Sequence, residues 1–68
     1  MIEFKPQEEY IPLIALLKAL HLVESGGEAQ LVVDEGLVKC NGKVELRRRF
    51  KVRPGHIVEF NGQVVKVI

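Results

Sequence analysis

A chain of 68 residues, of which 47% are apolar and 28% charged, has the size and composition of one small folded domain. Its longest apolar run contains Pro12 and stops at Lys18, far short of the roughly 20 residues that a membrane helix needs, so we expect no membrane partner. The single cysteine, Cys40, cannot form an internal disulfide, and the first residues lack the basic and apolar regions of a secretion signal. We therefore expect a single domain over residues 1–68, monomeric and cytoplasmic.

Charge is divided between the two halves of the chain. Residues 1–35 carry two basic against seven acidic residues, a net charge of −5, whereas residues 36–68 carry eight basic against two acidic residues, a net charge of +6. Such an asymmetry indicates one cationic face, which is typical of proteins that bind polyanions. The alternative is a dipolar surface without a ligand, because runs of charge often only solvate a strand.

The first third of the chain predicts a short strand and a helix. Apolar and polar residues alternate at positions 2–4, as in an edge strand. Pro12 suits a first helical turn, and leucines at 13, 16, 17 and 20 follow helical spacing. We expect a helix from about residue 12 to 21 that turns one leucine face to the core and leaves Lys18 off that face.

A second helix is framed by signals at both ends. Ser25 and Glu28 have the spacing of a capping box, in which the serine hydroxyl accepts the N–H of residue 28 and the glutamate accepts the serine N–H. Apolar residues at 29, 32 and 33 continue the helix, and Gly36 can adopt the positive φ that ends it. Two short helices joined by a tight turn predict a helix-turn-helix-like corner.

The second half of the chain predicts strands and hairpins. Asn41-Gly42 and Asn61-Gly62 each stand between strand-like segments, which indicates two hairpins with type I′ turns. Strands are expected before and after each turn, including one over residues 57–60. The fold class is therefore α+β, with two short helices packed on a small antiparallel β-meander.

The basic stretch at residues 46–53 fits an extended strand of period two. In that conformation Leu46, Phe50 and Val52 point inward, and the basic residues at 47, 49, 51 and 53 line the outside. Arg48 is then the one basic residue on the apolar side.

Residues that could carry catalysis or hold a metal are few. His21, Cys40 and His56 have a spacing unlike any compact zinc site, so we expect ordinary structural roles for them, and no metal or cofactor. No serine or cysteine stands beside a base oriented by a third group, which argues against an enzyme. We expect Cys40 in the core, whereas Tyr10 could either stack on a nucleobase or pack in the core.

From about Tyr10 to Ile68 the chain resembles the S-four domain, the RNA-binding domain first seen in the fourth protein of the small ribosomal subunit. It looks like the small stand-alone bacterial members of the YbcJ type. The matching features are the leucine-rich helix with Lys18, the Ser25–Ala29 turn, Gly36, Asn41-Gly42, Arg47-Arg48, Lys51, and Gly55 ahead of Val58.

This resemblance implies a non-catalytic module that binds structured RNA, ribosomal or transfer RNA, through the helix corner and the hairpin beside it, a surface called the alpha-L motif. Gln30 stands where the stand-alone members usually have a lysine, and His56 where an aspartate is common. With Arg49 and Arg53 added from the period-two alternation, the expected RNA contacts are Lys18, Ser25, Gly26, Gly27, Gln30, Lys39, Asn41, Lys43, Arg47, Arg48, Arg49, Lys51 and Arg53.

Two other functions fit a chain of this size. One is a protein-interaction module in which the acidic and basic halves dock on a protein partner and the fold is used without RNA. The other is a ubiquitin-like sulfur carrier, against which the ending Val67-Ile68, in place of a free diglycine, argues.

Overall fold

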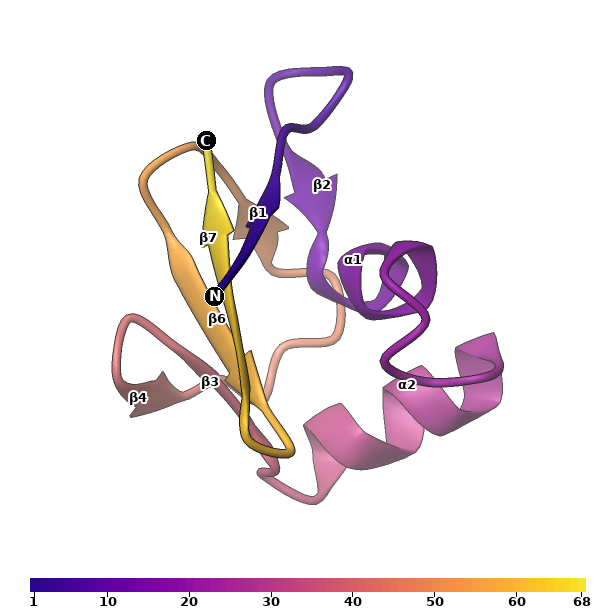
Figure 1. The fold of residues 1–68 in the computed structure, drawn as a ribbon. Helices are drawn as coiled ribbons and strands as arrows, with labels where there is room; N and C mark the ends of the chain where they lie inside the picture. Colours follow the sequence, from indigo (N-terminus) through magenta and orange to yellow (C-terminus); the bar gives the residue numbers. More distant parts are fainter.

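The computed structural model describes residues 1–68 and shows two helices packed against one face of a five-stranded sheet (Figure 1). This confirms the predicted α+β class. The elements in chain order are β1 (Ile2–Phe4), β2 (Ile11–Pro12), α1 (Leu13–Ala19), α2 (Gly26–Asp34), β3 (Val38–Cys40), β4 (Lys43–Val44), β5 (Lys51–Val52), β6 (Ile57–Phe60) and β7 (Gln63–Val67).

Helix α1 is shorter than predicted, because its boundary residues leave helical geometry early. Pro12 is the N-cap, with φ −60° and ψ 143°, and the helix ends at Ala19. His21, predicted as the last helical residue, has a φ of 56°, which turns the chain out of the helix. The predicted leucine face is confirmed: leucines 13, 16 and 17 are fully buried and Leu20 is half-buried.

Helix α2 begins and ends where the sequence predicts. The Ser25 hydroxyl accepts the Glu28 N–H at 3.1 Å, but the Glu28 carboxylate accepts the N–H of Glu24, at 2.7 Å, and not that of Ser25 as predicted. Gly36 has a φ of 74°. The Gly36 N–H donates to the carbonyl of residue 33, and the Leu37 N–H donates to the carbonyl of residue 32. These are the two hydrogen bonds of a Schellman motif.

The main sheet has the strand order β1-β7-β6-β3-β4. Both predicted hairpins are present, with positive φ at Asn41, Gly42, Asn61 and Gly62, as type I′ turns require. The predicted meander is wrong in two respects: β1 pairs in parallel with β7, and β3 lies between β4 and β6. The sheet is mixed because of the parallel β1–β7 pair, and β3 can pair with β6 because the chain leaves the sheet after β4 and returns at β6.

The segment between β4 and β6 pairs elsewhere. Only β5 is extended, and it forms a separate two-stranded sheet with β2, in which Ile11 stands opposite Val52. A turn with a hydrogen bond from the Phe50 N–H to the Arg47 carbonyl, at 3.2 Å, interrupts the alternation predicted for residues 46–53. Val52 is buried and Phe50 half-buried as predicted, but Leu46 is 61% exposed.

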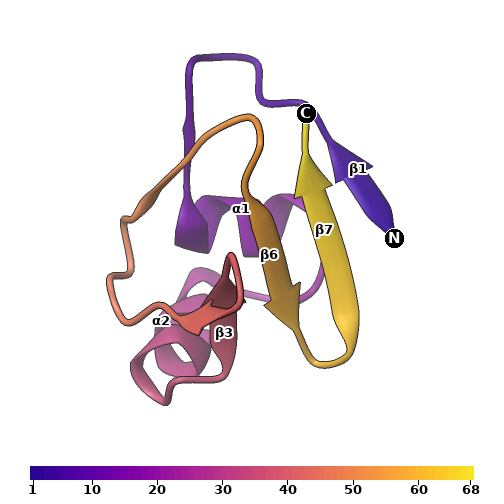
Figure 2. The same ribbon diagram turned by 90° about the vertical axis from the view of Figure 1, so that its left-hand side faces the viewer.

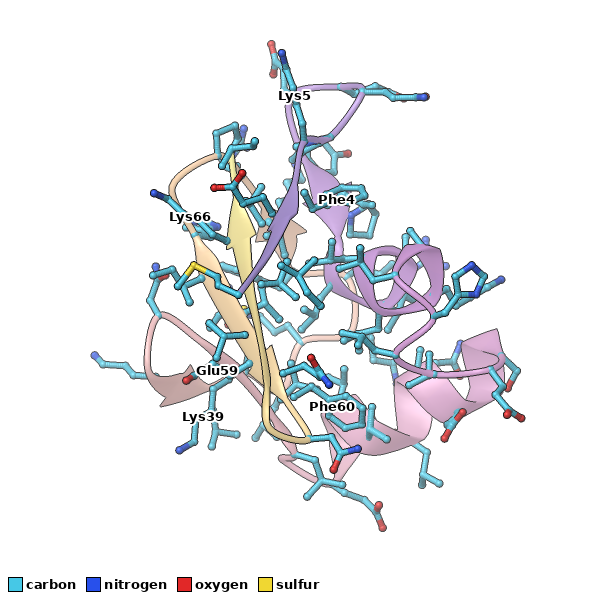
Figure 3. All side chains as sticks on the ribbon, in the orientation of Figure 1. Phe4, Lys5, Lys39, Glu59, Phe60 and Lys66 are labelled. Carbon is cyan, nitrogen blue, oxygen red and sulfur yellow. The ribbon has the colours of Figure 1, made fainter.

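The core fills the space between the helices and the inner face of the sheet. Figure 3 shows Phe4 and Phe60 on this inner side, whereas Lys39, Glu59 and Lys66 lie on the outer face of the sheet, away from the helices. Cys40 belongs to the core, as predicted, and burial raises the pKa of its thiol to about 11. Neither helix has the length and apolar character needed to cross a membrane.

Candidate nucleic-acid interface

The basic segment, residues 47–53, carries an arginine or lysine at five of its seven positions and is anchored on the start of α1. Helix α1 has no side-chain cap, because its N-cap is Pro12. Its first free amides therefore need other acceptors. The Leu13 N–H donates to the Phe50 carbonyl at 2.9 Å, and the Ile14 N–H donates to the Arg48 carbonyl at 3.1 Å. These two bonds fix the basic segment beside the start of α1.

Arg48 ties the basic segment to the second helix as well. Its Nε and Nη2 donate to Oδ1 and Oδ2 of Asp34 at 2.8 and 2.6 Å, and its Nη1 lies 3.4 Å from Oε1 of Gln30. The hydrogen bond from Arg48 lowers the pKa of the Asp34 carboxyl group. The prediction that Arg48 faces the apolar side is therefore wrong: its side chain is half exposed and reaches across the surface to α2.

Gly26, Gln30 and Asp34 follow one another every four residues, so they lie along one side of α2. Arg48 contacts the second and third of them. Lys18 adjoins the first, since a Cβ on Gly26 would lie 3.9 Å from the Lys18 Cδ, and the two residues share an open hollow of about 500 Å³. The structure thus brings Lys18 and Arg48 to the same side of α2.

Five residues of the basic segment, four of them cationic, surround a second hollow of about 640 Å³, which we call the basic hollow. Its lining contains no acidic side chain and consists of Arg47, Arg49, Phe50, Lys51, Arg53 and His56. In Figure 2 the chain that leads into β6 runs on the side of the molecule opposite β1. The basic hollow therefore offers four cationic groups on one side of the domain.

Aromatic rings and hydrogen bonds hold the side chains around the basic hollow. The Arg47 guanidinium lies 4.8 Å from the centre of the Phe50 ring, and that ring stacks on His56 at 5.6 Å. The Nδ1 atom of His56 accepts the Arg53 N–H at 3.0 Å. Arg47 also donates from its Nε to Oε2 of Glu45 at 2.9 Å, and this hydrogen bond lowers the pKa of the Glu45 carboxyl group.

The predicted contacts in the first hairpin lie apart from this group. Lys39 is on the outer face of the sheet, opposite Glu59 (Figure 3). The Asn41 side chain accepts the N–H of Ile57 at 2.8 Å, so it stabilises the hairpin against β6. Lys43 follows the turn and is exposed. Among these residues only Lys43 has a side chain that is both on the hairpin tip and without a structural partner.

The turn before α2 has a visible structural role. The Ser25 hydroxyl accepts a hydrogen bond from the Glu28 N–H, and Gly26 and Gly27 belong to the first turn of α2. RNA contact by these three residues stays a prediction.

The sequence did not indicate one residue of this region, Asp34, and left the role of another, Tyr10, open. Asp34 carried no signal, because its partner Arg48 is fourteen positions away. Tyr10, left open between stacking and packing, is 37% exposed, with the Lys51 Nζ 5.1 Å and the Arg53 Cζ 5.5 Å from its ring centre. Tyr10 immediately precedes β2, and no short pattern in the sequence indicated its contact with these two cations. No cluster of three or more His, Cys, Asp or Glu side chains is placed to hold a metal ion.

The sequence profile of the S4 domain matches residues 4–68. The chain belongs to the S4 domain family. This match confirms the resemblance and extends it to β1, ahead of the expected start at Tyr10.

Two bacterial relatives of the domain are 41% identical to this chain over 59 residues, which span 87% of this chain and 84% of each relative. They are "Putative RNA-binding protein YbcJ" of Escherichia coli (strain K12) and "Uncharacterized protein YbcJ" of Shigella flexneri. The solution structure of YbcJ from E. coli, described as revealing an alpha-L motif involved in RNA-binding, matches with a TM-score of 0.74 and 38% identity, covering 100% of this chain and 87% of that one. The fold of this S4 domain is thus that of the alpha-L motif structure.

Proposed function

We propose that this protein is a non-catalytic module that binds structured RNA, ribosomal or transfer RNA, by its shape and its phosphates. One observation carries the proposal: the basic segment is fixed to both helices by the backbone bonds to α1 and by the ion pair from Arg48 to Asp34. A cationic surface that is already ordered loses little conformational entropy when it binds. Structured RNA is recognised mainly through shape, phosphates and 2′-hydroxyl groups, which suits such a surface. Membership of the S4 domain family and the name of the E. coli relative support the same function.

The predicted contacts take different roles in this proposal. Lys18 and the arginines and lysines around the basic hollow contact phosphates, because their side chains are exposed and border open hollows. Arg48 holds the basic segment in place, with Gln30 and Asp34 as its partners. Lys39 lies outside the interface, on the outer face of the sheet.

The proposal places this binding in the bacterial cytoplasm. Both named relatives are bacterial, and the one cysteine is a free, buried thiol, which is compatible with a reducing compartment.

The first test is a salt titration with a fluorescent RNA stem-loop, followed by anisotropy. If about four to six phosphates are neutralised, a plot of log K against log salt has a slope of roughly −3 to −5. No binding at low salt, or a flat plot, would contradict RNA binding and leave docking on a protein partner as the alternative.

A pair of double variants locates the interface. Arg49→Ala with Lys51→Ala removes two charges from the basic hollow and is expected to weaken binding by about tenfold or more and to reduce the salt slope by about two. Lys39→Ala with Lys66→Ala removes the same charge from the outer face, so it controls for net charge and is expected to change affinity by less than about twofold. Equal losses in the two variants would show that only net charge matters, and a larger loss in the second would place RNA on the outer face.

A further inference from the structure

The ribbon formed by β2 and β5 presents an aromatic ring and two cations on its outer side. Its register places Pro12 opposite Lys51 and Ile11 opposite Val52, so Tyr10 comes next to Arg53. Val52 is buried in the core. Its neighbours along the strand therefore face outward, together with Tyr10. Both cations lie over the Tyr10 ring, at 5.1 and 5.5 Å.

The same two cations, Lys51 and Arg53, line the basic hollow. They therefore stand between an accessible aromatic ring and a space that is surrounded by positive charge and has no acidic side chain in its lining. Proteins that bind single-stranded nucleic acid combine these two parts, a cationic groove for the phosphates and an aromatic ring on which a base stacks. A base inside an A-form helix is already stacked on its neighbours and cannot offer its face to a side chain.

We propose that Tyr10, Lys51 and Arg53 form a site for one unpaired nucleotide of RNA, with its base stacked on Tyr10 and its phosphate in the basic hollow. The inference rests on the proposed function and deepens it: the RNA is a folded element that carries an unpaired nucleotide next to the part held by the helix corner. The base displaces one cation from the ring, and that cation then pairs with the phosphate. The exchange leaves no charge without a partner, and an aromatic base covers more of the ring than an exposed cation does.

The test compares three RNA probes built on one stem-loop: blunt, with a short adenosine tail, and with the same tail made abasic. For the wild-type protein we expect the adenosine tail to tighten binding about tenfold over the blunt probe, and the abasic tail to lose most of that gain. Tyr10→Ala should bring the tailed probe to the affinity of the blunt one and leave the blunt probe unchanged. Tyr10→Phe, which keeps the ring, should retain the preference.

A second measurement needs no variant, because Tyr10 is the one tyrosine of a chain without tryptophan. Its fluorescence therefore reports on this site alone. The tailed probe should quench it more than a blunt probe of matched absorbance does. Equal quenching, or equal affinity of wild-type protein for tailed and blunt probes, would overturn the nucleotide site, as would an equal loss of all three probes in Tyr10→Ala. Failure of the blunt stem-loop to bind at low salt would instead overturn the proposed function itself.

Discussion

Arg48 illustrates how one side chain connects the fold to the candidate interface. Its guanidinium group is already engaged by Asp34 and Gln30, so few of its donors remain for a phosphate. Its carbonyl accepts the N–H of Ile14 at the start of α1. Arg48 is therefore a positioning residue, which sets the orientation of the neighbouring cations.

This role predicts a change in RNA affinity opposite to the change expected from net charge alone. Removing an acidic residue near a polyanion normally strengthens binding. We expect Asp34→Ala instead to weaken RNA binding, by about two- to fivefold, because it releases Arg48 from α2. Glu35→Ala removes the same charge from the next position, where no ion pair is formed, and should bind RNA slightly more tightly. A gain of affinity in Asp34→Ala equal to that in Glu35→Ala would contradict the positioning role.

The core residue Cys40 gives a prediction about pH. Burial raises the pKa of its thiol from the ordinary 9.0 to about 11, with a further contribution from Glu45. Only the thiolate is alkylated, so at pH 8 the folded protein should react with iodoacetamide about a hundredfold more slowly than the urea-unfolded chain. Because the folded-state pKa is raised, the stability from the neutral thiol is complete below about pH 9 and is lost as the pH rises toward 11. Similar alkylation rates for folded and unfolded chains at pH 8 would be inconsistent with this burial.

At the scale of the elements, the two helices are joined at a corner whose geometry is fixed by local bonds. The Ser25 hydroxyl caps α2, and the residues just after it adjoin Lys18 on α1. The start of α2 is thus both a structural joint and part of the candidate interface. Its two roles can be separated by substitutions at one position.

We expect Ser25→Ala to lower the free energy of unfolding by about 1 kcal/mol, through loss of the cap. Ser25→Asp keeps a capping oxygen, so its stability should stay within about 0.5 kcal/mol of wild type, while its negative charge near Lys18 weakens RNA binding. Urea unfolding and RNA anisotropy measure the two effects. If Ser25→Asp were stable and bound RNA as wild type does, the corner would lie outside the interface.

Across the whole molecule, the arrangement of charge differs from face to face. On the outer face of the sheet, acidic and basic residues stand opposite one another, Glu3 with Lys66 and Glu59 with Lys39. Around the basic hollow four cations gather, and among them only Arg47 forms an ion pair with an acidic residue, Glu45. The expected cationic face is therefore the side that carries the basic segment, and the strand β1 lies on the opposite side (Figure 2).

This separation predicts that stability and binding can be changed independently. Phe4→Ala removes a half-buried ring from the packing of β1 on the core and should cost about 2 kcal/mol, or a fall in Tm of about 10 °C. RNA affinity measured well below Tm should be unchanged. Glu3→Ala, on the outer face of the same strand, is the matched control and should alter neither quantity. A loss of RNA affinity in Phe4→Ala while the protein is folded would mean that β1 influences the interface.

The features that could be predicted from the amino-acid sequence alone were local. The cap at Ser25, the stop at Gly36, the leucine face of α1 and the two Asn-Gly turns all depend on residues within a few positions of one another, and all are present. Membership of the S-four family was also readable from these short motifs.

Long-range contacts set the remaining features, because several strand pairings were compatible with the same local pattern. Residues 46–53 alternate as a strand does, but the uncapped amides of α1 take the carbonyls of Phe50 and Arg48, and this bends the segment away from the sheet. Strand β3 then pairs with β6, and the free edge of β7 is covered in parallel by β1 from the other end of the chain. Which cations gather around the basic hollow, and that Lys39 lies on the outer face of the sheet, follow from these long-range contacts, whose partners no short stretch of sequence specifies.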